Sequence, residues 1–513
     1  MNAEETAFNV NVKSIVERCL FGFDPAMFEA NTPAAQLADL NPLGYIFFRH
    51  HFAGCASLAD VRDLINQVKA RHRQPLFLGL DQEGGQVERL PSQLFHGGLS
   101  PFTVGEVERL NPKSGFAQRY YDWQSQGLAS LGFNLNFFPT LDAHLNPQNP
   151  IIGNRAFSSD PAEIKRLGQL AKDAQSTYGI QSVLKHYPGH GSGTVDSHLA
   201  LPTLDFTEAE ESSFVALMHD RPVPWVMLAH GVYPNLTDAS QHIPASCDPY
   251  FVTDRLRKHW GVTGLTITDD LNMHGLLQAF EGDQGKASLQ ALEAGVDVLL
   301  FREAGLHELN RVKALATALE EGRLNRQKHL TSVARVNLAQ KTLQQIETTT
   351  PEQLLPLEWH QAIEALHEEA METILADYTG ILTLEATCIV EPHATLLPHY
   401  AMEYVDGSLT SAFLPDSATR LTYETAQALS VHQALNTVKK QVLAFVWLPQ
   451  VGKPLLQALE ALHASGESAS VQTVVVVNLG TPIEGEYPLF TFINLGTARP
   501  PTLQTVLARL FSS

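Results

Sequence analysis

Residues 182–198 read SVLKHYPGHGSGTVDSH and join two different kinds of sequence. The opening SVL is a short apolar run of the kind that forms a buried strand. A lysine, three histidines and an aspartate follow it directly, spaced by glycines that allow the chain to turn sharply. A buried strand with polar residues at its end is typical of α/β barrels, whose catalytic groups lie at the carboxyl ends of parallel strands.

The same pattern recurs through the first two-thirds of the chain. Amphipathic stretches of helical period, such as 58–71, 162–178 and 284–294, separate short apolar runs. Eight β/α units in this length favour an α/β fold with an N-terminal (β/α)8 TIM-like barrel over an open doubly wound sheet. The eight predicted strands are RCLFGF (18–23), GYIFF (44–48), PLFLGLD (75–81), FNLNFFP (133–139), SVLKHYP (182–188), WVMLAHG (225–231), LTITDDL (265–271) and VDVLLF (296–301).

A second, smaller domain is predicted after the barrel. The stretch 341–361, KTLQQIETTTPEQLLPLEWHQ, indicates the end of a helix, then a Thr/Pro-rich linker, then the beginning of a second domain. We therefore assign residues 1–345 to the barrel, 346–360 to a linker and 361–513 to an α/β sandwich-like domain of uncertain role. Its apolar runs are ILTLE (381–385), VLAFVW (442–447), VVVVNLG (474–480) and LFTFINLG (489–496), with a helical segment at 454–463.

Charge and composition restrict the partners. Lys and Arg number 35 against 55 Asp and Glu, so the net charge is −20, which disfavours nucleic acid and anionic membrane surfaces. We expect the partner to be a small molecule or the end of a polymer. The amino terminus lacks a basic start followed by an apolar core, and no run approaches the ~20 apolar residues of a spanning helix, so we predict a cytoplasmic protein. The four cysteines lack paired spacing and indicate neither a disulfide frame nor a cysteine metal site.

Polar side chains follow four of the predicted strands. Asp81, Lys185 with His186, His230 and Asp269 each stand at the trailing end of an apolar run. One such residue would be no more than a helix cap, but the repetition favours a site at one end of the barrel. Among them Asp269 is the carboxylate best placed to attack a substrate or to stabilise a cation. Its neighbour Asp270 should point elsewhere, because side chains alternate along a strand.

The loop that follows Lys185 and His186 offers a proton donor and acceptor. Asp196 lies two residues before His198, so its carboxylate can bond one ring nitrogen and leave the other free. A nucleophilic role for Ser197, which lies between them, is disfavoured because no nucleophile-elbow pattern surrounds it.

Two other interpretations of the histidines in this loop stay open. His186, His190 and His198 could bind a metal, but their spacing lacks the register of common zinc sites, and no metal or cofactor is expected. The histidines could also tie the loop down through hydrogen bonds, and we expect this structural role for His190.

Longer motifs carry a resemblance to a known family. The chain resembles glycoside hydrolase family 3, in its β-N-acetylhexosaminidase (NagZ-type) branch, and the resemblance covers nearly its whole length. The end of the chain, EYPLFTFINLGTARPPTLQTVLARLF, is similar to the end of the sandwich in two-domain members. The motifs are FGFD (21–24), GYIFF (44–48), LDQEGGQVERL (80–90), FNLNFFPTLD (133–142), NPIIGNRAFSSDP (149–161), KHYPGHG with DSH (185–198), MLAHGVYP (227–234) and TITDDLNMHG (266–275).

The resemblance implies a retaining glycoside hydrolase. It assigns Asp269 as nucleophile and His198 as general acid/base, oriented by Asp196. The implied substrate is an N-acetylglucosaminyl-1,6-anhydro-muramoyl fragment, released in the cytoplasmic recycling of bacterial cell wall. The implied substrate-binding residues are Asp81, Arg89, Arg155, Lys185 and His186.

Other functions remain open at this stage. Some relatives with the same His–Asp pair are phosphorylases, in which phosphate replaces water. A glucosidase or xylosidase is disfavoured because many of those take their acid from the second domain, whereas this chain has DSH in the barrel. The intact motif positions also disfavour a catalytically silent sugar-binding protein.

Two departures from the family pattern leave the preference for the leaving group open. Gln86 stands where many relatives have arginine, and Ser192 with Gly193 stands where many have Asp-Thr.

Overall fold

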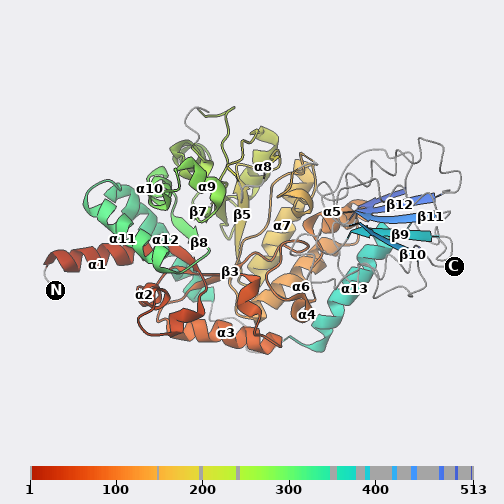
Figure 1. Cartoon of the computed structure of the whole chain (residues 1–513), viewed down its shortest axis with the longest axis horizontal. Coiled ribbons are helices and arrows are strands. Elements are labelled where there is room, and N and C mark those ends of the chain that lie inside the picture. Colours follow the sequence, from red (N-terminus) through yellow and green to blue (C-terminus); the bar gives the residue numbers. More distant parts are fainter. Residues whose placement is uncertain are drawn as a thin grey trace.

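The structure, a computed structural model, describes residues 3–346 apart from 97, 147–148, 196–199 and 238–242. Beyond these it describes residues 355–376, five further strands and residue 510. The first part forms a closed barrel of eight parallel strands, which confirms the predicted fold (Figure 1). Each predicted run overlaps one strand. The strands are β1 (Cys19–Gly22), β2 (Gly44–Phe47), β3 (Phe77–Leu80), β4 (Leu135–Asn136), β5 (Gln181–Tyr187), β6 (Trp225–Leu228), β7 (Thr266–Asp270) and β8 (Val298–Phe301).

Helices surround the barrel and begin at residues that cap them. Asp160 accepts a hydrogen bond from the Ala162 amide at 2.9 Å, and Pro161 takes the first helical position of α7. Ser57 and Asp283 cap α3 and α10 in the same way. The helices are α1 (Ala3–Val16), α2 (Pro33–Asp39), α3 (Leu58–Arg71), α4 (Ser92–Phe95), α5 (Pro101–Leu110), α6 (Phe116–Ser130), α7 (Pro161–Thr177), α8 (Glu208–Leu217), a π-helical segment (Tyr250–His259), α9 (His274–Ala279), α10 (Gln284–Ala294), α11 (Leu306–Glu320) and α12 (Arg326–Ile346).

Two apolar layers arise from the alternation of side chains along the strands. Leu20 and Ile46 belong to the cluster inside the barrel, whereas their neighbours Phe21 and Phe47 belong to the larger cluster that includes the surrounding helices. Residues of α12 join the inner cluster and cover the amino-terminal end of the strands. A cavity lined by the polar residues that follow the strands lies at the opposite, carboxyl-terminal end.

Two strands carry an irregularity close to that open end. In the ladder between β5 and β6, Leu184 pairs with Val226 and Tyr187 pairs with Leu228. Three residues of β5 therefore lie opposite two of β6. Between β7 and β8, likewise, Ile267 pairs with Val298 and Asp270 with Leu300, so three residues of β7 lie opposite two of β8. Each irregularity is a one-residue bulge, which redirects side chains and interrupts their alternation.

The second part contains a sheet of five parallel strands in the order β10-β9-β11-β12-β13. Three of the four runs predicted there contain strands, whereas ILTLE (381–385) and the helical segment 454–463 lie outside the described residues. Strands β9 and β10 were not predicted. The strands are β9 (Thr387–Pro392), β10 (Thr419–Tyr423), β11 (Gln441–Val446), β12 (Thr473–Asn478) and β13 (Thr491–Asn494).

Helix α13 (Leu357–Ile374) lies between the barrel and this sheet (Figure 1). It packs against α5 and α6. The indoles of Trp123 and Trp359 stack with ring centroids 4.7 Å apart, and each indole N–H donates to the other residue's carbonyl, at 3.1 and 2.9 Å. Gly127 has no side chain to obstruct this contact, since a Cβ there would lie 2.5 Å from Trp359. The helix begins inside the range predicted as linker, and the domain boundaries stay a prediction.

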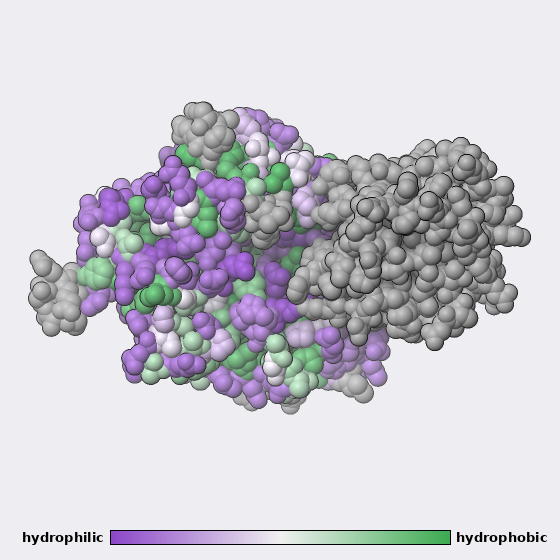
Figure 2. Space-filling view, in the orientation of Figure 1, coloured by the Kyte–Doolittle hydropathy of each residue, from purple (hydrophilic) through white to green (hydrophobic). Residues whose placement is uncertain are grey.

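The described surface of the barrel in Figure 2 is mainly hydrophilic, with apolar residues scattered over it. Among the described residues, no helix combines the length and apolar character needed to cross a bilayer.

Replacing Trp359 by alanine should weaken the attachment of α13. The side chain is 4% exposed, and removing a buried aromatic ring costs about 3–5 kcal/mol of unfolding free energy. Thermal unfolding of Trp359→Ala should show a clearly lowered midpoint, whereas Glu358→Ala, at an exposed neighbour, should not. Equal midpoints for the two variants would show that α13 contributes little to the stability of the barrel.

Candidate active site

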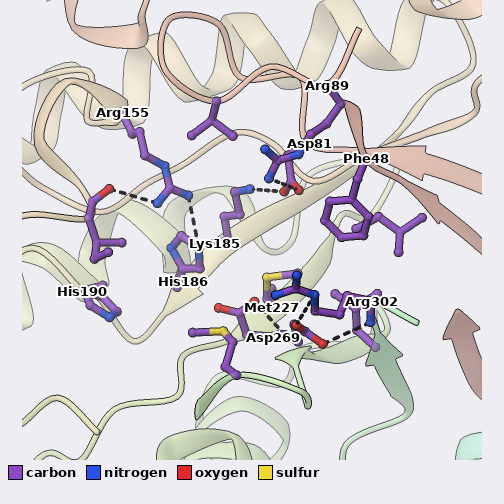
Figure 3. A pocket seen from close by; sticks show the side chains of 16 residues that line it. Phe48, Asp81, Arg89, Arg155, Lys185, His186, His190, Met227, Asp269 and Arg302 are labelled. Atoms are coloured by element: carbon purple, nitrogen blue, oxygen red, sulfur yellow. Dashed lines mark hydrogen bonds and ion pairs between the residues drawn. The ribbon is translucent and has the colours of Figure 1, made fainter. Parts of the chain in front are cut away.

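A cavity of about 160 Å3 lies at the carboxyl-terminal end of the barrel (Figure 3). Figure 3 shows Arg155, Lys185 and Asp81 along one side, with Asp269 and Arg302 on the opposite side. Strands β2 to β8 or the loops that follow them supply the lining. The lining residues are Ile46, Phe48, Asp81, Val87, Arg89, Ile151, Arg155, Lys185, His186, His190, Met227, Asp269, Asp270, Met273, Leu300 and Arg302.

A network of ion pairs forms one wall of the cavity. The Lys185 ammonium, whose side chain is 2% exposed, lies 2.7 Å from an Asp81 oxygen and 2.6 Å from a Glu83 oxygen. Arg89 donates to the other Asp81 oxygen at 3.0 Å, and Arg155 binds both Glu83 oxygens at 2.9 Å. Bidentate geometry of this kind fixes the guanidinium plane as well as its position. Three loops are thereby held together.

The electrostatic balance keeps both carboxylates of this wall ionised. Burial would raise the pKa of Asp81, but Lys185 and Arg89 outweigh it and hold that pKa well below its ordinary value. Burial likewise opposes ionisation of Glu83, yet Arg155 and Lys185 lower its pKa to about 2. The wall therefore presents fixed donors and acceptors at neutral pH.

Asp142 holds the two histidines that follow Lys185. Its carboxylate accepts from the His186 ring Nδ1 at 2.7 Å and from the backbone N–H groups of His186 and His190 at 3.0 and 2.7 Å. The other ring nitrogen of His186 lies 3.4 Å from an Arg155 Nη atom, where a lone pair is favoured over a second N–H. His186 is thus held with its Nδ1–H donating to the Asp142 carboxylate.

Asp269 lies at the end of β7, opposite the ion-pair wall. Its carboxylate accepts from the Asp270 amide at 2.7 Å. The expectation that Asp270 points away from the site is wrong, because Asp270 also lines the cavity. The bulge in β7 interrupts the strict alternation on which that expectation rested. Burial raises the pKa of Asp270 to about 7, so its carboxyl is largely protonated below that pH and adds little negative charge beside Asp269.

His230 contacts the backbone at the end of β7. Its side chain is buried, and its ring lies 2.7 Å from the Ser246 hydroxyl and 3.1 Å from the Asp270 carbonyl oxygen. Burial lowers its pKa, so the ring is held neutral between these two groups. We infer that His230 positions the backbone that carries Asp269.

His190 does not have the structural role expected for it. Its backbone N–H is fixed by Asp142, but neither of its buried ring nitrogens has a hydrogen-bond partner within the described part of the chain. The ring instead lines the cavity.

The structure brings together six of the eight predicted site residues. Asp196 and His198 lie in the segment 196–199, outside the described residues, so their roles stay predictions. The six residues that line the common cavity are Asp81, Arg89, Arg155, Lys185, His186 and Asp269.

Two buried carboxylates at this site were not predicted. Glu83 and Asp142 are both fully buried and hold Arg155, Lys185 and His186 in place. Each stands within or at the end of a motif singled out in the sequence, DQEGG and FFPTLD, but their partners come from other strands. The sequence signal that could have identified them is the position of each carboxylate shortly after a predicted strand.

A wider cleft of about 790 Å3 adjoins the cavity and shares Phe48 and Arg89 with it. The Arg89 guanidinium lies over the Phe48 ring, 5.4 Å from its centroid. Arg49, His50 and Gln86 also line this cleft. Gln86, one of the departures from the family pattern, therefore lies beside the cavity and not within it.

Metal ligation finds no support in the part of the chain that the structure describes, where no group of three or more His, Cys, Asp or Glu side chains could hold an ion. This finding does not extend to His198.

Glu210 holds the loop after β5 through hydrogen bonds, and no ion pair of its carboxyl group is present among the described residues. Its carboxylate accepts from the backbone N–H groups of Ala143 and Gly191, both at 3.0 Å. Gly189 allows the close approach, because a Cβ there would lie 2.3 Å from this carboxyl group. Burial, reinforced by the Asp142 charge, raises the pKa of Glu210 to about 8. The group is therefore mainly neutral at pH 7.

Known proteins resemble the barrel part of this chain in sequence. The profile of the glycosyl hydrolase family 3 N-terminal domain matches residues 29–339. β-Hexosaminidase A of Pseudoalteromonas piscicida is 31% identical over 316 residues, 57% of this chain and 52% of that protein, so the chain spans about half of that relative. A β-hexosaminidase of Haemophilus influenzae is 32% identical over 287 residues, 53% of this chain and 76% of that protein.

A solved structure has the same fold over both parts. The glycoside hydrolase family 3 β-N-acetylglucosaminidase from Paenibacillus sp. FPU-7 aligns with a TM-score of 0.75 at 24% identity, covering 97% of this chain and 96% of that one.

Glu210→Gln should change how stability depends on pH. The folded pKa of about 8 lies above the ordinary 4.5, so the stabilising contribution of this proton is complete below about pH 4.5 and is lost as pH rises toward about 8. Glutamine keeps an oxygen acceptor and never ionises. The variant should therefore gain unfolding free energy relative to the wild type by up to about 1.4 kcal/mol per pH unit in this window.

The measurement is chemical denaturation of both proteins from pH 4.5 to 9. Glu208→Gln makes the same change at an exposed position of the same helix and should follow the wild-type curve. If Glu210→Gln also ran parallel to the wild type at every pH, the buried neutral carboxyl would be refuted.

Proposed function

The chain belongs to glycosyl hydrolase family 3, and we propose that it hydrolyses terminal β-linked N-acetylglucosamine from a saccharide with retention of configuration. The observation that carries this proposal is the placement of Asp269 across a small cavity from the ion-pair wall of Asp81, Lys185 and Arg155. The names of the relatives, which are β-hexosaminidases, support the choice of sugar.

The ion-pair wall suits recognition of an uncharged sugar. A polyol offers several O–H donors and acceptors, and charged partners make stronger hydrogen bonds with them than neutral groups do. The wall stays fully charged near neutral pH, because the pKa values of Asp81 and Glu83 are depressed. Donors fixed in advance also stabilise charge that develops on the ring in the transition state.

The proposed reaction has two steps. The Asp269 carboxylate attacks the anomeric carbon and forms a covalent glycosyl-enzyme, while the bond to the leaving oxygen breaks and His198 protonates that oxygen. His198, oriented by Asp196, then removes a proton from water, which attacks the anomeric carbon and releases Asp269. Two inversions give net retention. The roles of His198 and Asp196 rest on the sequence motif.

The neighbour of Asp269 supports its role as nucleophile. A carboxylate attacks best when it is ionised, and a second full charge next to it would raise its pKa. Because burial keeps much of the Asp270 population protonated up to about pH 7, Asp269 can carry the negative charge of the pair. Of the two adjacent carboxyl groups, Asp269 is therefore the one suited to act as the charged nucleophile.

The adjoining cleft is a suitable place for the leaving group. It opens from the cavity at Phe48 and Arg89, and Arg49 gives it a second guanidinium. We propose that it takes the 1,6-anhydro-muramoyl part of a cell-wall fragment, whose carboxylate an arginine can bind. On this proposal the protein works in the cytoplasmic recycling of bacterial cell wall.

Asp269→Ala should abolish turnover of a chromogenic N-acetyl-β-glucosaminide. Loss of the nucleophile should lower kcat/KM by roughly 10³-fold or more, whereas Asp254→Ala, at an exposed carboxylate of the π-helical segment, should leave it unchanged. The products are identified in buffers with and without saturating phosphate. Free N-acetylglucosamine under both conditions is the expected result.

Other products would change the assignment. Release of a sugar 1-phosphate would identify a phosphorylase that uses the same cavity. Absence of turnover by the wild type would refute the proposed sugar, and β-glucosides and β-xylosides would be the substrates to measure next.

A further inference from the structure

His190 is a buried polar side chain whose ring finds no hydrogen-bond partner in the part of the chain that the structure describes. It is 3% exposed, and both ring nitrogens lack a hydrogen-bond partner within the described residues. The ring lines the cavity that contains Asp269. Leaving a buried donor or acceptor without a partner costs about 1–3 kcal/mol, so an apolar residue would serve a purely structural purpose better.

The backbone, and not the ring, fixes the position of His190. Its N–H donates to Asp142 at 2.7 Å, and its carbonyl accepts from the Asn149 side-chain amide at 2.8 Å. The ring lies against that of His186, with centroids 6.1 Å apart, and its Nδ1 faces Gly193. The imidazole is thus held in the cavity wall with both ring nitrogens buried and unpaired within the described residues, so a ligand seated against the ring would meet an unsatisfied donor and acceptor.

The charge state of the ring limits what that ligand can be. Burial lowers the pKa of His190 to about 4, an effect that the Arg155 guanidinium and His186 reinforce and the Asp142 carboxylate opposes. At neutral pH the imidazole therefore has one N–H donor and one lone-pair acceptor. Such a group is suited to an uncharged hydroxyl or amide and contributes no charge to an anion.

We propose that His190 is a substrate-contacting residue, whose ring hydrogen-bonds an uncharged hydroxyl or acetamido substituent of the saccharide in the cavity with Asp269. The proposal rests on the glycosidase function proposed above. It adds a contact on the side of the cavity formed by the loop after β5, next to Arg155 and His186. The bound sugar then supplies the partner that the ring lacks.

The test compares His190→Phe, which removes both nitrogens, with His190→Gln, which keeps a donor and an acceptor. KM and kcat are measured on chromogenic N-acetyl-β-glucosaminide and β-glucoside, the affinity for N-acetylglucosamine by calorimetry, and the midpoint of thermal unfolding alongside. His72→Phe is the matched control, because the His72 ring has a partner, the Tyr45 hydroxyl at 3.1 Å.

We expect His190→Phe to raise KM and the N-acetylglucosamine Kd by roughly 10- to 100-fold, with a smaller change in kcat and no loss of thermal stability. His190→Gln should recover part of the affinity. His72→Phe should show the opposite pattern, with a lowered unfolding midpoint and unchanged KM. A penalty confined to the N-acetylglucosaminide would assign the contact to the acetamido group, and an equal penalty on both substrates would assign it to a hydroxyl.

Two results would overturn the proposal. One is an unchanged KM and Kd in both His190 variants. The other is a lowered unfolding midpoint with unchanged affinity, which would give His190 the structural role of His72. If the wild type neither cleaved these substrates nor bound N-acetylglucosamine, the proposed function and this contact would fail together, whereas a normal wild type with unaffected variants would remove the contact alone.

Discussion

The burial of Lys185 between two carboxylates is the constraint on which the rest of the site depends. An ammonium that is 2% exposed is tolerated only because Asp81 and Glu83 lie within 2.7 Å of it. Removing one partner of such a buried pair typically costs about 3–5 kcal/mol, because the remaining charge is left uncompensated. The loops after β3 and β4 are thereby held at a fixed distance from β5, and Arg89 and Arg155 take their orientation from the same carboxylates. The donors on this wall are in place before any ligand arrives.

The opposite wall depends on backbone geometry more than on charge. The bulge in β7 brings the adjacent residues Asp269 and Asp270 to the same cavity, and His230 binds the Asp270 carbonyl from behind. A second bulge, in β5, lies where Lys185 and His186 both face the cavity. Strand ends with an extra residue thus supply two neighbouring side chains where a regular strand would supply one. The carboxyl-terminal end of the barrel therefore departs from ideal geometry in β5 and β7, which both line the cavity.

The sequence was sufficient for the barrel and for much of the site. Apolar runs such as SVL and TIT identify buried strands, and the carboxyl ends of parallel strands must meet, so Asp81, Lys185 and Asp269 were expected at one place.

The orientation of Asp270 could not be predicted, because a bulge depends on the pairing with β8. Glu83 and Asp142 were missed because their partners come from distant strands. The expected role of His190 was wrong for a related reason, since its hydrogen bonds depend on which groups surround the ring. Strands β9 and β10 were missed because TCIVEP and TRLTY are short and rich in polar residues.

The central claim is that Asp269 forms a covalent bond with the sugar in this cavity. The most direct measurement is mass spectrometry of the protein after incubation with a slow donor, such as a 5-fluoro derivative of N-acetylglucosaminyl fluoride, whose fluorine slows both steps while fluoride leaves readily. The account predicts one adduct per chain, mapped by peptide digestion to Asp269 and absent from Asp269→Ala. An adduct on Asp270 or another carboxylate, or turnover of the wild type by inversion without any adduct, would contradict it.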